Sequence, residues 1–146
     1  MQSPIPYRKL LVRMIFLITL TVIIYSCQDA ERLNQDIYYT NGRDIYIKKC
    51  QNCHGDKGQG LGQLVPPLTD TVYLKENKRK IACFIKNGMS EKIMVHGQSY
   101  EDKMPAFPEM ANIDIAQVTV YISNSFGNNQ GMYTTEAVAA DLKACP

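Results

Sequence analysis

The sequence predicts an all-α fold wrapped around one bound group, and three observations support this. Apolar residues recur at helical spacing in several separate segments, and no stretch shows the sustained alternation of a strand. Two cysteines and a histidine fall within the five residues from Cys50 to His54. The loops between the helical segments are long, and long loops inside a small domain usually enclose something. The 146 residues are sufficient for one such domain.

The first 26 residues have the layout of an export signal. Three basic residues, Arg8, Lys9 and Arg13, precede the uncharged run from Met14 to Tyr25, and the segment contains no acidic residue. The run is 12 residues long, whereas a membrane-spanning helix needs roughly 20. We therefore expect residues 1–26 to be a cleaved signal rather than a retained spanning helix.

The end of this run, IIYSCQD, resembles the lipobox of bacterial lipoproteins. Ile24 stands three residues before Cys27, and Ser26 stands directly before it, although Tyr25 is bulkier than that pattern usually has. The resemblance implies cleavage before Cys27 and lipid attachment to it. The protein would then be exported and anchored on the periplasmic side of a bacterial membrane. The alternative is an ordinary soluble signal followed by an unrelated cysteine.

Removing the signal changes the charge balance. The whole chain carries 16 basic and 14 acidic residues, and loss of the three signal cations leaves 13 against 14, a net charge of about −1. This balance gives no support for nucleic acid binding. Residues 27–38 are polar and lack periodicity, which indicates a tether before a single domain at residues 39–146.

The domain should begin with a helix that starts near Asn41. Gly42, Tyr46, Cys50 and Cys53 follow one another at spacings of four, four and three, which places them on one helical stripe.

Three further helices are expected in NKRKIACFIKNG, NIDIAQVTVYISNSFGN and TTEAVAADLKAC. Gly88 is the expected C-terminal cap of the first of these, and Thr135 the expected N-cap of the last. Their expected core residues are Ile81, Phe84, Ile85, Ile115, Val118 and Ile122.

The sequence Cys50-Gln51-Asn52-Cys53-His54 has the spacing of a c-type haem attachment site. Thiols about one helical turn apart can add to the two vinyl groups of one haem, and the adjacent imidazole can bind its iron. A redox-active dithiol would be expected near a β-α-β pattern, which is missing. A structural zinc site needs four ligands, and the body offers only two further cysteines and one further histidine. An ordinary disulfide is the third alternative.

The sixth ligand of the iron decides whether the haem can only pass electrons or can also bind gases and activate peroxide. The candidates are Met89, Met94, His96, Met104 and Met110. We favour Met104, because Pro105 stiffens the chain beside it and it lies late in a long loop, far enough along to return over the haem. With His54, it would complete the axial pair.

These motifs together resemble a small class I cytochrome c over roughly residues 42–140. The residues that carry the resemblance are GRDIYIKKCQNCHG, Pro66, MPAF at Met104, and VTVYISNSFGN. The resemblance implies that the carbonyl of Pro66 orients the ligating imidazole, since a hydrogen bond to the other ring nitrogen fixes the tautomer. It also implies a close helix crossing at Gly42, Tyr46 and Tyr121.

The predicted function is that of a monohaem electron carrier, without a catalytic residue, whose iron alternates between Fe(II) and Fe(III). The segment NGMSEKIMVHGQSYEDKMPAF is similar to c-type domains that accompany quinoprotein dehydrogenases, copper nitrite reductases and haem-copper oxidases, which implies protein donors and acceptors. The alternatives are a haem enzyme or gas sensor with a displaceable sixth ligand, a cytochrome subunit of a larger oxidoreductase, and a non-haem thiol or metal-binding module.

Two cysteines remain once Cys27 is assigned to lipid and the two thiols of the motif to haem. In an oxidising compartment we expect the remaining pair, Cys83 and Cys145, to form a disulfide.

A cluster of basic residues between the prolines and Met104 predicts a positive surface that would steer an acidic partner. Its members are Lys75, Lys78, Arg79, Lys80, Lys86 and Lys92.

Overall fold

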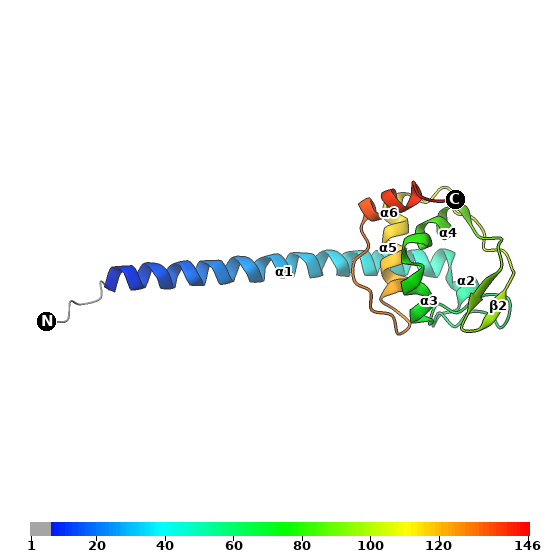
Figure 1. Cartoon of the computed structure of the whole chain (residues 1–146), viewed down its shortest axis with the longest axis horizontal. Helices are drawn as coiled ribbons and strands as arrows, with labels where there is room; N and C mark the ends of the chain where they lie inside the picture. The colour runs from blue at the N-terminus through cyan, green and yellow to red at the C-terminus, as the bar shows by residue number, and fades with distance from the viewer. Residues whose placement is uncertain (1–6) are drawn as a thin grey trace. The chain divides into compact units, whose positions relative to one another are not determined.

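The computed structural model describes residues 7–146, with the exception of the side chains of residues 24–29 (Figure 1). The chain divides into two compact units, Met1–Asn34 and Gln35–Pro146. Helix α1, Tyr7–Lys49, contributes residues to both. Cys27, the expected site of lipid attachment, lies outside the side chains that the structure describes.

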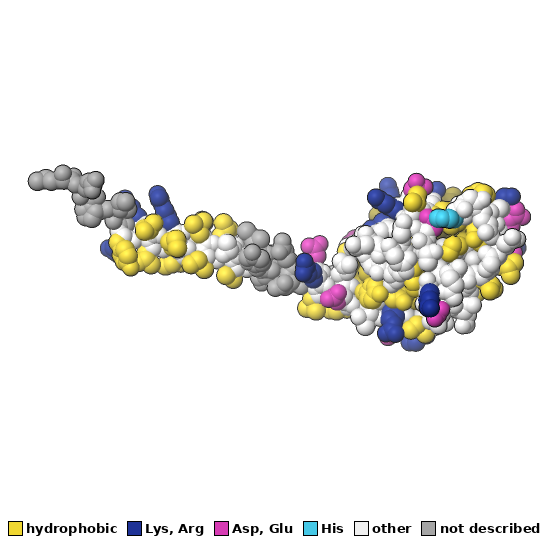
Figure 2. Space-filling model, turned by 90° about the horizontal axis from the view of Figure 1, so that it is seen from below, with side chains coloured by type: hydrophobic (Ala, Val, Ile, Leu, Met, Phe, Trp, Pro, Cys, Tyr) yellow, Lys and Arg dark blue, Asp and Glu magenta, His cyan; other side chains and the backbone are white. Residues whose placement is uncertain are grey.

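The described part of the first unit is the beginning of α1. Its large apolar side chains are exposed from Tyr7 to Ile23, as with Phe16 at 65% (Figure 2). Within the described residues, no helix combines the length and the apolar character that crossing a membrane requires.

The second unit is mainly helical and agrees with the predicted all-α fold (Figure 1). After α1 its elements are α2 Gln51–His54, α3 Thr71–Glu76, the 3-10 turn η1 Lys78–Lys80, α4 Ile81–Asn87, β1 Ile93–Val95, β2 Gln98–Tyr100, α5 Asn112–Ser123 and α6 Thr135–Leu142. The core is formed largely by α5, and the expected core residues are buried except for Phe84, which is half-buried.

The helix start expected near Asn41 is wrong, because α1 is already helical there and continues to Lys49. The side chains before Asn41 are mostly exposed, so this part of the helix needs no apolar stripe and its sequence shows no apolar period. Several residues there are nevertheless acceptable or good helix formers: Ala30, Glu31, Arg32 and Leu33.

Helix α1 crosses α5 at Gly42, where the backbones come close together. A Cβ atom at Gly42 would collide with the carbonyl of Gln117. One turn later the fully buried ring of Tyr46 packs on Tyr121, with 5.2 Å between the ring centroids. The close crossing expected from the class I resemblance is therefore present.

The C-terminal end of α4 and the N-terminal end of α6 are capped by a glycine and a threonine, the residue types that the sequence predicts. Gly88 caps α4 with a positive φ of 73°, as predicted. The N-cap of α6 is Thr134 rather than the predicted Thr135, because the Thr134 hydroxyl accepts the hydrogen bond from the amide of Ala137 at 3.2 Å.

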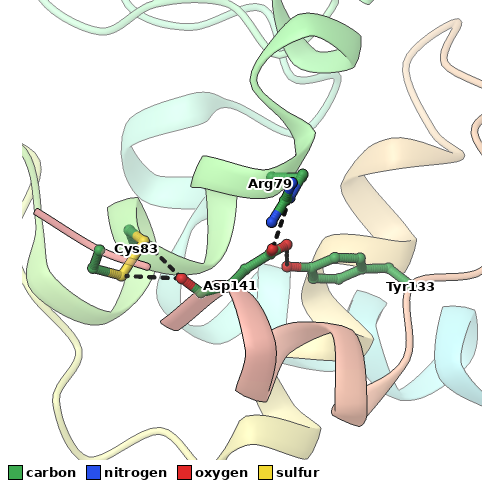
Figure 3. A network of polar contacts seen from close by, with 5 residues as sticks. Arg79, Cys83, Tyr133 and Asp141 are labelled. Carbon is green, nitrogen blue, oxygen red and sulfur yellow. Dashed lines mark hydrogen bonds and ion pairs between the residues drawn. A yellow bond between two sulfur atoms is a disulfide. The ribbon is translucent and has the colours of Figure 1, made fainter. Parts of the chain in front are cut away.

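Helix α6 is fastened to α4 and its preceding turn by a polar network and a disulfide (Figure 3). The buried carboxylate of Asp141 accepts hydrogen bonds from the Arg79 guanidinium at 3.0 Å and from the Tyr133 hydroxyl at 2.8 Å. Beside it, the sulfur atoms of Cys83 and Cys145 are joined at 2.07 Å. Burial and the neighbouring carboxylate raise the pKa of Tyr133, so its hydroxyl remains a donor throughout the physiological range.

A two-stranded hairpin, β1–β2, lies within the long loop, which was expected to lack regular structure. His96 and Gly97 form its two-residue turn, and both have positive φ, 54° and 76°. That combination is typical of a type I′ turn.

We expect Gly42→Ala to lower the free energy of unfolding by at least about 2 kcal/mol, because the new methyl group meets backbone rather than a movable side chain. At an uncrowded helix position alanine would stabilise the helix by about 1 kcal/mol relative to glycine. The sign of the change in the free energy of unfolding therefore distinguishes a crowded position from an open one. Denaturant unfolding measures the change, and Asn41→Ala at the exposed neighbouring position is the control. A stabilised Gly42→Ala protein would contradict the close crossing.

Candidate haem site

The residues of the Cys-Cys-His motif line a cavity of about 310 Å³ in the second unit. Apolar side chains make most of the remaining wall: Leu61, Leu64, Val65, Pro66, Ile93, Pro105 and Phe107. Two larger hollows, of about 740 and 840 Å³, are lined neither by His54 nor by the free thiols, although the second adjoins this cavity and shares Met89, Glu91 and Ile93 with it.

Cys50 and Cys53 are placed by the end of α1 and the short α2. The amide of Cys50 donates to the carbonyl of Tyr46 at 2.9 Å, and the amide of His54 donates to the carbonyl of Cys50 at 2.9 Å, so the helical path continues through the motif. The two thiols are free, with Cys50 partly buried and Cys53 exposed.

The electrostatics of Cys50 argue against a redox-active dithiol. Burial, reinforced by the neighbouring Cys53, raises the pKa of Cys50 to about 11. Dithiol catalysts work through thiols whose pKa is lowered, since the thiolate is the reactive form. Burial disfavours the charged thiolate, whereas a thioether carries no charge and is not disfavoured by the same surroundings.

His54 is held in one tautomer and in its neutral form. Its Nδ1 lies 3.2 Å from the carbonyl oxygen of Pro66, and since a carbonyl can only accept, Nδ1 carries the proton. Burial lowers the pKa of His54. The unprotonated Nε2 is therefore available as a ligand, in the orientation that the hydrogen bond fixes.

The loop that carries Pro66 is folded back tightly. Leu61 pairs with Val65 in a short bridge, and the amide of Leu68 donates to the carbonyl of Gly58 at 2.7 Å. Gly60 is required here, because with its φ of 71° a Cβ atom would collide with the carbonyl of Val65.

Met104 lines the same cavity from a different segment of the chain. Its amide and carbonyl exchange hydrogen bonds of 2.9 and 3.0 Å with Met89. Three residues on, the amide of Phe107 donates to the carbonyl of Ile85 at 3.0 Å. The ammonium of Lys86 then donates to the two carbonyls of Pro108 and Met110, at 2.7 and 2.8 Å. The Met104 segment is thus fixed along the C-terminal end of α4.

The other candidate ligands lie elsewhere, except for Met89, which also lines the cavity. Met94 is 55% exposed on β1, and Met110 is buried in the core at 4%. The Nδ1 of His96 lies 3.1 Å from a carboxylate oxygen of Asp70, at the turn of the hairpin. Asp70 also caps α3, and bonds from the amide of Tyr73 and from His96 lower its pKa.

A zinc site finds no support in the part of the chain that the structure describes, since no three His, Cys, Asp or Glu side chains are grouped there to hold a metal ion. The donor set that is present fits a covalently attached haem instead. It comprises two free thiols, a neutral imidazole and thioethers around a mainly apolar cavity.

Sequence reasoning missed Lys86 and Gly88 as supports of the site. Lys86 was grouped with the basic cluster, of which Lys78, Arg79 and Lys92 also have partners: the carbonyl of Gln130, Asp141 and Glu101. A lysine two residues before a C-capping glycine and a long loop is the available signal, although it does not say which carbonyls the lysine meets.

Comparison with known proteins agrees with this donor set. The sequence profile of the family described as cytochrome c oxidase, cbb3-type, subunit III, matches residues 39–122. The chain belongs to this cytochrome c family. Members carry covalently bound haem c and transfer electrons.

Two relatives are cytochromes c-552 of Thermus thermophilus. Each is 30% identical over 92 residues, which is 60% of this chain and 70% or 62% of the relative. The cytochrome c subunit of the quinone-dependent alcohol dehydrogenase of Gluconacetobacter polyoxogenes is 27% identical over 107 residues. That match covers 70% of this cytochrome and 22% of the subunit.

We expect Lys86→Gln to lower the free energy of unfolding by about 1–2 kcal/mol, because two carbonyls lose a charged donor. It should also loosen the Met104 segment, which faster exchange of the amide hydrogens of Met104 and Phe107 would detect. The matched control is Lys80→Gln, which removes the same charge from an exposed residue of η1. Equal behaviour of the two variants would show that Lys86 does not hold the segment.

Proposed function

We propose that this cytochrome is a lipid-anchored electron carrier of an exported redox chain, with His54 and Met104 as the axial ligands of its haem iron. The observation that carries the ligand assignment is that a neutral, oriented imidazole and the Met104 side chain line one cavity together with both attachment thiols. The bound haem supplies the one-electron chemistry, Fe(II) to Fe(III) and back.

The residues of the chain serve to keep the structural rearrangement that accompanies this change of oxidation state small. Pro66 holds the imidazole of His54 in one orientation, and the bonds of Lys86 and Met89 hold the Met104 segment. Rigid ligands rearrange little when charge changes, which favours rapid transfer. A thioether ligand also favours the reduced state and raises the reduction potential.

The anchor rests on the sequence. Three cations precede the uncharged run from Met14 to Tyr25, and the lipobox-like IIYSC ends at Cys27. Cleavage there would leave the haem domain joined to the lipid by residues 28–38. Electron-transfer partners are proposed to be membrane-associated oxidoreductases, in keeping with the relative named as a subunit of a quinone-dependent alcohol dehydrogenase.

Replacing Met104 with histidine tests the ligand assignment. We expect Met104→His to keep the haem and to lower the reduction potential by on the order of 0.1 V, because imidazole stabilises Fe(III) better than a thioether does. Potentiometric titration measures the shift. Met94→His, at an exposed methionine outside the cavity, should leave the potential unchanged. A five-coordinate, high-spin spectrum of the wild-type protein would instead favour a gas-binding or catalytic role.

Replacing Cys27 with alanine tests the anchor. We expect the wild-type protein to partition into the detergent phase and to carry lipid at its N-terminus by mass spectrometry, whereas Cys27→Ala should be extracted without detergent. Detergent-free extraction of both proteins would refute the anchor while leaving the haem ligands untouched.

A further inference from the structure

Met89 and Met104 form a hydrogen-bonded pair of an antiparallel bridge. The amide of Met89 donates to the carbonyl of Met104 at 3.0 Å, and the amide of Met104 donates to the carbonyl of Met89 at 2.9 Å. Residues paired in this way have Cα atoms about 5.5 Å apart, with both side chains on the same face. Both side chains do line the haem cavity.

Gly88 allows the two segments to approach this closely. A Cβ atom on Gly88 would lie 2.6 Å from the carbonyl oxygen of Met104 and 2.9 Å from the amide of Ala106. The positive φ of 73° also turns the chain there, so that Met89 follows α4 directly into the bridge. The position of Met89 is therefore set by the same backbone contacts that set Met104.

The cavity accordingly presents two thioethers beside His54, where one would be sufficient. Its other nitrogen donors are poorer competitors. Lys49 is engaged with Glu109 at 3.0 Å and lies over the ring of Phe107, and the ammonium of Lys103 has no lone pair to donate. The thioether of Met89 needs no deprotonation, and it suits the same oxidation states of the iron as the thioether of Met104.

We infer that Met89 is a second axial ligand, which binds the haem iron whenever Met104 does not. The inference rests on the proposed function, in which Met104 is the resident ligand. In the exchange, the sulfur of Met89 donates a lone pair in place of the sulfur of Met104. One bond from sulfur to iron breaks and one forms, no proton or electron moves, and the charge of the site is unchanged. The bridge itself consists of main-chain bonds, so it does not need the Met104 side chain.

The consequence is a cytochrome that keeps its iron closed to outside ligands. If the Met104 side chain is lost or oxidised, the site retains a thioether instead of opening to a gas or to water. Because the exchange is neutral, it is independent of pH, unlike replacement by a lysine or by hydroxide.

The test uses the holoprotein with methionine labelled by ¹³C at the methyl group, in which NMR identifies any methyl shifted strongly by the iron. The variants are Met104→Leu, the double variant Met104→Leu/Met89→Leu, and Met94→Leu as the control. Leucine preserves most of the side-chain volume and leaves the bridge intact. We expect one shifted methyl in the wild type, assigned to Met104. We expect a different one in Met104→Leu, and none in the double variant.

Carbon monoxide binding by the reduced proteins gives a second readout. Occupancy of the iron by Met89 for nine-tenths of the time should weaken carbon monoxide binding by Met104→Leu about 10-fold relative to the double variant. The spectrum of Met104→Leu should also be constant from neutral to mildly alkaline pH.

The outcomes separate the two proposals. A wild-type protein without any shifted methionine methyl refutes ligation by Met104, and with it the proposed function. A shifted Met104 methyl in the wild type, with none in Met104→Leu, refutes only the second ligand. A pH-dependent sixth ligand in Met104→Leu refutes it as well, since Lys103 or water would then have taken the position.

Discussion

The close crossing of α1 and α5 at Gly42 is the constraint on which the rest of the second unit depends. Two turns of helix separate Gly42 from Cys50, so the angle and depth of the crossing decide where the thiols of Cys50 and Cys53 and the imidazole of His54 lie. Tyr46 lies between them, and its hydroxyl donates to the carbonyl of Gly55 at 2.6 Å. The helix packing and the haem motif are thereby one rigid piece.

The second half of the site is built differently, from a loop without a helix beneath Met104. Its order comes from main-chain and ammonium bonds to the end of α4, through Met89, Ile85 and Lys86. A helix end is a suitable partner, since its last carbonyls and the residues that follow are free to bond outside the helix. The two kinds of support meet at one cavity, and neither is sufficient alone.

Much of this was predictable from sequence because the features are local. The Cys-Cys-His spacing, the C-cap at Gly88 and the apolar period of α5 each depend on residues within a turn or two of one another. Elimination among the five cysteines predicted the pair that the structure joins, Cys83 and Cys145. What escaped prediction depends on tertiary contact or on unfamiliar turn chemistry. The start of α1 carries no amphipathic period to mark it, and the His96–Gly97 turn is an uncommon sequence for a hairpin. The roles of Met89 and Lys86 appear only once the chain has returned to α4 from about 20 residues away.

The disulfide and the Asp141 network also decide how the body opens. Joining the chain's end to α4 holds α4, α6 and η1 together, while α5 is held by α1. The stretch from Gly88 to Met110 lies between these two parts and contributes few buried side chains, namely Val95, Tyr100 and Met110. A stretch with few buried apolar contacts unfolds locally at a lower free energy than packed helices do. Amide hydrogens in this stretch should therefore exchange before those of α4, α5 and α6, so this stretch can open while the packed helices stay folded.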